Sequence, residues 1–413
     1  MSRGFKIGLA VNGAIVLAGL GAWFLQLREG LILTDMQNGF TWGLYVAALA
    51  FFVGNAAGGL VLSSSIYLFG AAHLKPFARL GALTAFANVT AAMLIIVPDI
   101  GRPERLFEIL LHANWMSPLV WDVIVLSAYA VLSLAYLFIM MLPDLRGRLG
   151  AALAGRLDDP GAFSDRWSRR LAPFALLFAV SIHVVTAWIF STQGAREWWF
   201  TPALAPDFVA VAVASGTAVV VIAAAIAYGV GREYARAYRS LALIIFGALA
   251  VHLFLMFNDF FIHTWFGAEG ADELVRLTWS AHPVGHLFEV VAPLVAALLL
   301  LAERVRRSVR GLAMSAGLLI LGVFVHRFLI MPAAMNLIPL TLQPLGQPGT
   351  LWSMPIATGR FSEGVTSFAA HWDYFPSVVE WMIFTASVAF VIVLILLAVA
   401  ALPVLQGRTA DVG

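Results

Sequence analysis

A stretch between two apolar runs, VPDIGRPERLFEILLHANWMSPLVWDV at residues 97–123, is crowded with ionisable side chains. An ionisable side chain that faces lipid costs several kcal/mol, so one inside or beside an apolar run indicates a functional site. Helix capping leaves His112, Asn114 and Asp122 unexplained. We therefore expect Asp122 to accept protons, with His112 or His183 as its partner.

Helix-start signals explain part of the same stretch. Ser117 is placed to cap the helix that Pro118 begins, and Trp115 and Trp121 fit the aromatic belt at a membrane surface. We count Trp115, Ser117 and Trp121, with Asn114, among the candidate binding residues of this segment.

Two later segments carry the same types of side chain. NDFFIHTWFG contains Asp259, and HPVGHLFE contains His286 and Glu289. With Asp122 and Glu380, these acids lie near the outer ends of apolar runs, where they are either functional or simply solvated helix ends. If functional, they suit a hydrophobic ring compound that gains and loses protons as it is oxidised and reduced.

The deeper histidines, His183, His252 and His326, are interpreted first as hydrogen-bonded core residues. Haem b needs paired axial histidines at matching depth on facing helices. The sequence offers His183 with His326 as such a pair, and we favour the interpretation without haem.

Composition places the chain in a membrane. Its 413 residues are 61% hydrophobic and 12% charged, with a mean hydropathy of +0.90, whereas a soluble domain is roughly a quarter charged. There are no cysteines, so this chain cannot hold a thiolate metal site or a cysteine-ligated iron–sulfur cluster. The pI near 9.0 reflects basic loops on one side of the membrane and does not indicate a nucleic-acid partner.

Ten runs are long and apolar enough to cross a bilayer. They are residues 7–27, 42–69, 80–97, 119–141, 171–190, 208–230, 241–262, 284–302, 312–329 and 378–402. Ten crossings put both termini on one side, and most of the 25 Lys and Arg residues lie in the loops of that side. This bias predicts cytoplasmic termini, and the acids concentrate on the opposite, outer face.

The fold class we expect is an all-α integral membrane protein built from two four-helix bundles and two flanking helices. Polar residues recur at matching places in spans 2–5 and 6–9, although chance could also produce that pattern. The expected parts are 1–41 (first helix and outer loop), 42–200 (first bundle), 201–330 (second bundle) and 331–413 (long outer loop and last helix).

At WGLYVAALAFFVGNAAGGLVLSS, followed by IVPDIGRPERLFEILLHANWMSPLVWDV, the chain resembles the NrfD-like polysulfide-reductase membrane subunits. The resemblance extends through IHVVTAWIFSTQ and LAPDFVAVAVASG, and ten spans suggest the long branch of hydrogenase-2-type, sulfite-reductase-associated and alternative-complex-III subunits. It implies that Arg102 and Arg105 order the turn and that the quinone pocket lies toward the outer face of the first bundle. Some relatives carry a histidine in the glycine-rich span, where this chain offers only Asn55.

The function that this resemblance implies is electron exchange between menaquinone or ubiquinone and a ferredoxin-like iron–sulfur partner at the outer face. A molybdopterin enzyme, a hydrogenase or a multihaem cytochrome would complete the complex, in the bacterial inner membrane. Two alternatives stay open: a transporter or proton channel that uses Asp259, His286 and Glu289, and a passive membrane anchor. The sequence leaves the direction of electron flow and the quinone type open.

Overall fold

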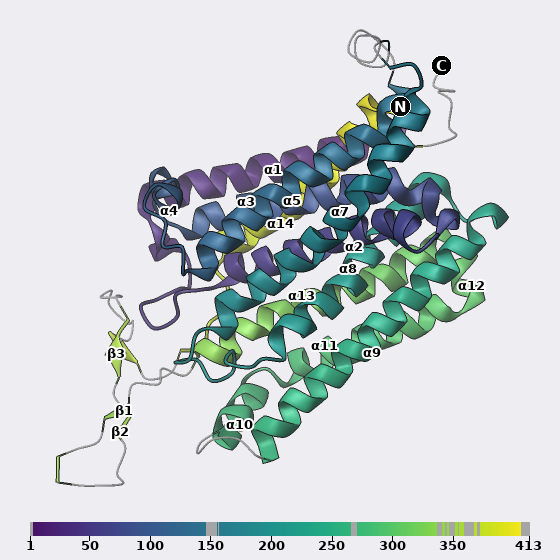
Figure 1. Cartoon of the computed structure of the whole chain (residues 1–413). Helices are drawn as coiled ribbons and strands as arrows, with labels where there is room; N and C mark the ends of the chain where they lie inside the picture. The colour runs from purple at the N-terminus through teal and green to yellow at the C-terminus, as the bar shows by residue number, and fades with distance from the viewer. Residues whose placement is uncertain are drawn as a thin grey trace.

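The computed structural model describes residues 3–145, 155, 157–265, 271–336 and 372–405, and short pieces between 341 and 369. Ten of its helical segments are long and apolar enough to cross a membrane, and they run side by side (Figure 1). The spanning helices are α1 (Arg3–Glu29), α2 (Leu44–Leu68), α3 (Ala78–Asp99), α5 (Pro118–Met141), α7 (Pro160–Ser191), α8 (Leu204–Tyr228), α9 (Ala235–Trp265), α11 (Pro283–Leu301), α13 (Val309–Met335) and α14 (Val378–Ala401). The described chain is therefore an all-α integral membrane protein.

Short elements join these helices. The short helices are η1 (Leu31–Leu33), η2 (Ala72–Phe77), η3 (Pro103–Arg105), α4 (Glu108–Leu111), η4 (Leu142–Asp144), η5 (Arg232–Tyr234), α10 (Ala271–Ala281) and α12 (Glu303–Arg306). Two antiparallel ladders, β1 (Thr341–Leu342) with β2 (Trp352–Ser353) and β3 (Ile356–Ala357) with β4 (Phe368–Ala369), belong to the loop before α14. Most linkers of the described chain thus contain short helices, and the loop before α14 contains the two ladders.

Helix packing forms two sets of four. In one set α2 packs against α3 and α7, and α5 packs against α3 and α7. In the other, α8 and α11 each pack against both α9 and α13. The two sets meet mainly where α8 lies against α2 and α7 and where α13 lies against α2, and α2 is buried along almost its whole length. An apolar helix with so little polar surface suits this central position.

Glycines let α2 approach its neighbours closely. A Cβ atom added at Gly58 would lie 2.0 Å from the carbonyl carbon of Gly216 on α8, and one at Gly59 would lie 2.0 Å from the carbonyl oxygen of Gly81 on α3. The glycine-rich sequence of the second span predicts such close contact, and the structure places the backbones accordingly.

The flanking helices α1 and α14 pack against each other and run antiparallel. Gly8 faces Leu396, and Gly19 faces Ala386, so the start of α1 lies beside the end of α14 (Figure 1). Leu17 and Phe24 on α1 are each 70% exposed, as expected for side chains that contact lipid. Both ends of the described helical core therefore lie on the same side of the bundle.

Candidate functional site

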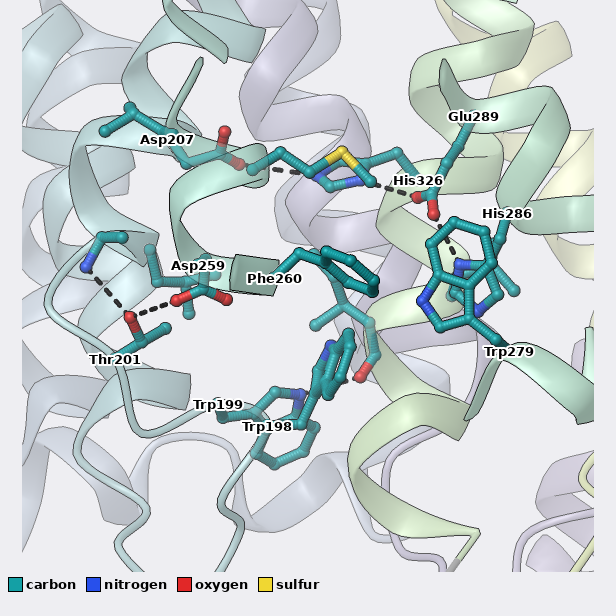
Figure 2. Close-up of a pocket in the computed structure, with 16 residues that line it drawn as sticks. Trp198, Trp199, Thr201, Asp207, Asp259, Phe260, Trp279, His286, Glu289 and His326 are labelled. Carbon is teal, nitrogen blue, oxygen red and sulfur yellow. Dashed lines mark hydrogen bonds and ion pairs between the residues drawn. The ribbon is translucent and has the colours of Figure 1, made fainter. Parts of the chain in front are cut away.

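A cavity opens within the second set of helices, between α8, α9, α11 and α13 (Figure 2). The space between its walls and in front of its mouth, open solvent included, is about 760 Å³. Its lining is Trp198, Trp199, Thr201, Ala203, Leu204, Asp207, Leu255, Met256, Asp259, Phe260, Trp279, His286, Glu289, His326, Leu329 and Ile330. Most of these side chains are apolar or aromatic, and the polar ones come from all four helices. Such a lining is typical of sites that bind small, largely apolar molecules.

Aromatic rings form much of the wall. Trp199 is 2% exposed and its indole Nε1 donates a hydrogen bond of 2.8 Å to the carbonyl of Ile330, which fixes its ring. Trp279 of α10 stacks on the imidazole of His286, with 4.8 Å between the ring centroids. Phe260 extends into the middle of the view in Figure 2. The cavity is thus shaped by flat, rigid side chains.

On one side, Glu289 binds two imidazoles. Its Oε1 lies 2.6 Å from His286 Nδ1, and its Oε2 lies 2.8 Å from His326 Nδ1. His286 and Glu289 are three residues apart, so they share one face of α11, and both are 3% exposed. The other imidazole nitrogen of His286, Nε2, is buried and has no partner among the described residues.

A second carboxylate, Asp207 on α8, extends the same cluster. Its Oδ1 lies 2.5 Å from His252 Nδ1 on α9, and its Oδ2 lies 3.5 Å from His326 Nε2 on α13. Arg327, which follows His326, is 1% exposed and places its guanidinium 3.6 Å from the ring centroid of Phe208. Two carboxylates, three imidazoles and a guanidinium therefore meet inside the second set of helices.

Some side chains of this cluster are also close enough together to be considered as metal ligands. One ligand atom each from Asp207, His252 and His326 lies within 4.8 Å of the other two. However, Asp207 already shares a hydrogen bond of 2.5 Å with His252, which an ion would have to displace. We assign no metal ion to these residues.

Asp259 lies on the opposite side of the cavity (Figure 2). The hydroxyl of Thr201 donates a hydrogen bond of 2.6 Å to its Oδ1, and its side chain is 27% exposed. His263, one turn further along α9, contacts the same turn through Nδ1, which lies 2.8 Å from the Asp259 carbonyl oxygen. The cavity thus has one half-buried acid on one side and a buried acid–imidazole pair on the other.

Three predicted site residues, Asp259, His286 and Glu289, come together in this cavity, whereas Asp122 does not line it. Asp122 is 3% exposed on α5, and its Oδ1 lies 2.6 Å from the Thr186 hydroxyl on α7. That hydroxyl also lies 2.6 Å from the Ile182 carbonyl oxygen. Its single proton can serve only one of these acceptors, so a protonated Asp122 would satisfy both contacts.

His183, the predicted partner of Asp122, is held by the backbone. Its Nδ1 lies 2.6 Å from the carbonyl oxygen of Ala179, and its Nε2 lies 3.1 Å from that of Val53 on α2. Only Nε2 therefore links α7 to α2, whereas Nδ1 contacts the preceding turn of α7 itself, and both contacts fit the interpretation of a hydrogen-bonded core histidine. Asn55, close to this contact on α2, is 3% exposed, and its Oδ1 has no partner among the described residues.

The segment before α5 lies at the surface. His112 is exposed and pairs with Glu108 at 3.2 Å. Asn114 accepts a hydrogen bond from the Met116 amide, and Trp115 is 67% exposed. None of these side chains lines the cavity.

The remaining predictions for this segment concern its turn and its cap. Arg102 and Arg105 are exposed, and no hydrogen bond or ion pair of either side chain is found among the described residues. Ser117 occupies the N-cap position of α5, but its side chain makes no capping hydrogen bond. Trp121 Nε1 donates to the carbonyl of Trp115 at 2.7 Å, which ties the segment to the helix start.

Sequence reasoning missed the contributions of Asp207 and of Trp198, Trp199 and Thr201. Asp207 follows Pro206 in the first turn of α8, where an acid normally indicates a helix start. Its burial at 7% exposure follows from contact with α9 and α13. An acid directly before the apolar run of the sixth span was the available signal.

These observations define a class: a polytopic membrane protein with a mostly apolar cavity lined in part by titratable side chains. The chain belongs to the NrfD family of polysulphide reductase membrane proteins, whose family model matches residues 32–339.

Three relatives show the range of this family. A protein of Halobacterium salinarum, named as a membrane component of a dimethyl sulfoxide reductase, is 40% identical over 53% of this chain and 51% of its own length. A subunit of the selenate reductase of Mesobacillus selenatarsenatis is 23% identical over 97% of this chain and 94% of its own. The Hdr-like menaquinol oxidoreductase integral membrane subunit of Archaeoglobus fulgidus is 26% identical over 50% and 47%. The matched stretch thus spans about half the length of the first and third relatives.

Proposed function

We propose that this chain is the membrane subunit of an oxidoreductase complex and binds a quinone or quinol in the cavity of the second helix set. The observation that carries the proposal is the buried, unpartnered Nε2 of His286 at the wall of an aromatic, mostly apolar cavity. A buried nitrogen without a partner loses its hydrogen bonds to water unless a ligand replaces them.

The cavity suits the shape and polarity of this ligand. A quinone is a flat apolar ring with two oxygens, and it supplies two-electron chemistry coupled to two protons. Trp279 and Phe260 offer flat surfaces to the ring. His286 and Asp259 stand on opposite sides of the space (Figure 2), where each can exchange a hydrogen bond and a proton with one oxygen.

The absence of cysteines from this chain and the names of its relatives both support additional subunits in the complex. With no cysteines, electrons have to leave to another polypeptide, and we propose a ferredoxin-like iron–sulfur subunit at the outer face. The name of one relative includes menaquinol, which supports a quinone as the ligand, and we propose menaquinone or ubiquinone. A molybdopterin enzyme, a hydrogenase or a multihaem cytochrome would complete the complex in a bacterial inner membrane.

Asp122 provides the competing location. The resemblance to the family implies a pocket in the first bundle, where Asp122 is buried against Thr186. The cavity described above lies instead among helices of the second set. The two locations make different predictions for single substitutions, so one experiment separates them.

The experiment measures binding of a quinol analogue, heptyl-hydroxyquinoline N-oxide, to the full chain in lipid nanodiscs. Quenching of tryptophan fluorescence reports the Kd, because three tryptophans line the cavity. His286→Ala should weaken binding by roughly tenfold or more, which corresponds to about 1.4 kcal/mol. The matched control is His73→Ala, because His73 contacts Ser240 away from the cavity, and its Kd should stay unchanged.

Other results would contradict the proposal. Loss of binding in Asp122→Asn with unchanged binding in His286→Ala would move the quinone site to the first helix set. If neither the wild-type chain nor any variant binds the analogue, the result would favour the transporter and anchor interpretations.

A further inference from the structure

A row of hydrogen-bonded side chains runs along the wall of the cavity, because Glu289, His326 and Asp207 line it together with His286, and the row ends at His252, which is not part of the lining. Starting from His286, the contacts are His286 Nδ1 to Glu289 Oε1 (2.6 Å) and Glu289 Oε2 to His326 Nδ1 (2.8 Å). They continue from His326 Nε2 to Asp207 Oδ2 (3.5 Å) and from Asp207 Oδ1 to His252 Nδ1 (2.5 Å). The five residues come from α11, α13, α8 and α9, and His252 lies a little past the middle of α9.

Glu289 determines where the protons of two imidazoles lie. An ionised carboxylate only accepts hydrogen bonds, and each oxygen of Glu289 contacts an Nδ1. His286 and His326 therefore both carry a proton on Nδ1. A neutral imidazole has only one N–H, so the Nε2 atom of a neutral His286 is an acceptor that faces the cavity.

The same reasoning gives a different result for His326. If it were neutral, its Nε2 lone pair would face the Asp207 carboxylate at 3.5 Å, and two acceptors would oppose each other. A proton on Nε2 removes this conflict and makes His326 an imidazolium between two carboxylates. We propose that these five side chains form a proton relay that holds one mobile proton, located on His326 at rest, and exchanges it with the cavity ligand through His286.

The sum of the buried charges is consistent with one mobile proton in the relay. Asp207 and Glu289 contribute two negative charges, and Arg327, which interacts electrostatically with Asp207, contributes one positive charge. One imidazolium brings the sum to zero, and an unbalanced charge at this depth would be costly. A divalent ion would instead leave an excess positive charge and break the hydrogen bond between Asp207 and His252.

Other titratable groups face the relay from neighbouring elements. Asp259 on α9 interacts electrostatically with Asp207, and His183 on α7 interacts with Arg327. His282, just before α11, lies close to His286, and its pKa is lowered by burial and by that imidazole, with Asp373 opposing the shift. A neutral His282 leaves the charge sum of the relay unchanged.

The relay deepens the proposed function, on which its link to quinone rests. Reduction of a quinone takes up two electrons from the iron–sulfur partner and two protons, and quinol oxidation releases them. One proton passes through His286 and the relay, and the other passes through Asp259, which is 27% exposed. The contact of 3.5 Å between His326 and Asp207 has to shorten during transfer, because it is longer than a good hydrogen bond.

The test is ¹⁵N NMR of the full chain, labelled at histidine, in lipid bilayers. Spectra are recorded about two pH units above the ordinary histidine pKa of ~6.5, where an exposed imidazole is neutral. We expect the wild-type chain to keep one imidazolium signal that His326→Gln removes. Asp207→Asn should lower the proton affinity of that imidazole roughly tenfold or more, and Asp207→Glu should restore it.

Controls separate this result from misfolding and from failure of the quinone proposal. Asp144→Asn removes a carboxylate that pairs with Arg79 elsewhere and should leave the signal unchanged. A wild-type spectrum without an imidazolium, an imidazolium unaffected by Asp207→Asn, or stoichiometric zinc in the purified chain would overturn the relay. If the imidazolium is present but heptyl-hydroxyquinoline N-oxide shifts no His286 signal, the quinone proposal fails and the proton site stands.

Discussion

At the scale of single residues, Glu380 has a structural role that its position near an apolar run conceals. Its carboxylate accepts hydrogen bonds of 2.9 Å from the amides of Asp35 and Ser377 and one from the Tyr374 hydroxyl. The Ser377 hydroxyl in turn accepts from the Glu380 amide, which completes a capping box at the start of α14. Glu380 is fully buried, so these donors depend on it.

Glu380→Ala should therefore destabilise the chain by about 3 kcal/mol, because it leaves the buried Tyr374 hydroxyl and two half-buried amides without their acceptor, at ~1–3 kcal/mol for each buried donor. Thermal unfolding in nanodiscs, followed by circular dichroism, measures the effect. The matched control is Glu303→Ala, since Glu303 pairs with Arg307 at the surface and exposed pairs contribute little. Equal unfolding midpoints for the two variants would contradict this role.

The residue types in the sequence were enough to predict part of the candidate site but not all of it. Acids and histidines near the ends of apolar runs pointed to Asp259, His286 and Glu289, because burying such groups is costly without a function. Asp207 and His326 became part of the same cluster only when α8 and α13 brought them together. That pairing depends on how each helix is rotated about its axis, which local sequence does not specify.

At the scale of elements, hydropathy predicted all ten spanning helices, and most ends agree within a few residues. The largest difference is at α7, which begins at Pro160 instead of 171. Asp159 explains the early start, because its side chain accepts a hydrogen bond of 2.9 Å from the Ala162 amide and caps the helix. The first turns of α7 are polar, so a window that averages hydropathy excludes them.

The crossing of α2 and α8 should be the packing contact most sensitive to added volume. A Cβ at Gly216 would lie 2.3 Å from the backbone nitrogen of Gly58, and backbone atoms cannot move aside as a side chain can. Gly216→Ala should therefore cost at least the ~1–3 kcal/mol of ordinary overpacking and reduce the yield of folded chain. Thermal unfolding and size-exclusion chromatography measure these effects.

Gly247→Ala is the matched control at the same scale. Gly247 lies within α9, and an added Cβ would have no atom within 4 Å. Alanine also favours helix more than glycine does, so this variant should be neutral or slightly stabilising. A Gly216→Ala chain as stable as Gly247→Ala would show that the two helix sets can separate at little cost.

At the scale of the whole molecule, the arrangement of the helices ties the cavity to one side of the membrane. The antiparallel pair α1 and α14 puts the start and the end of the helical core on the same side. The cavity lies toward the other end, because Trp198 and Thr201 belong to the connection between α7 and α8. The side of the membrane on which the proposed proton path through Asp259 would open therefore depends on the orientation of the chain.

The distribution of Lys and Arg predicts that orientation, with the termini in the cytoplasm. The chain has no cysteines, so a single introduced thiol reports its own side without background. Glu104→Cys, in η3 after α3, should react with a membrane-impermeant maleimide in intact spheroplasts. Glu303→Cys, in α12 on the opposite side, should react only after permeabilisation, and both positions are exposed. The reversed pattern would place the cavity at the cytoplasmic face, and the proposed iron–sulfur partner would then have to bind there.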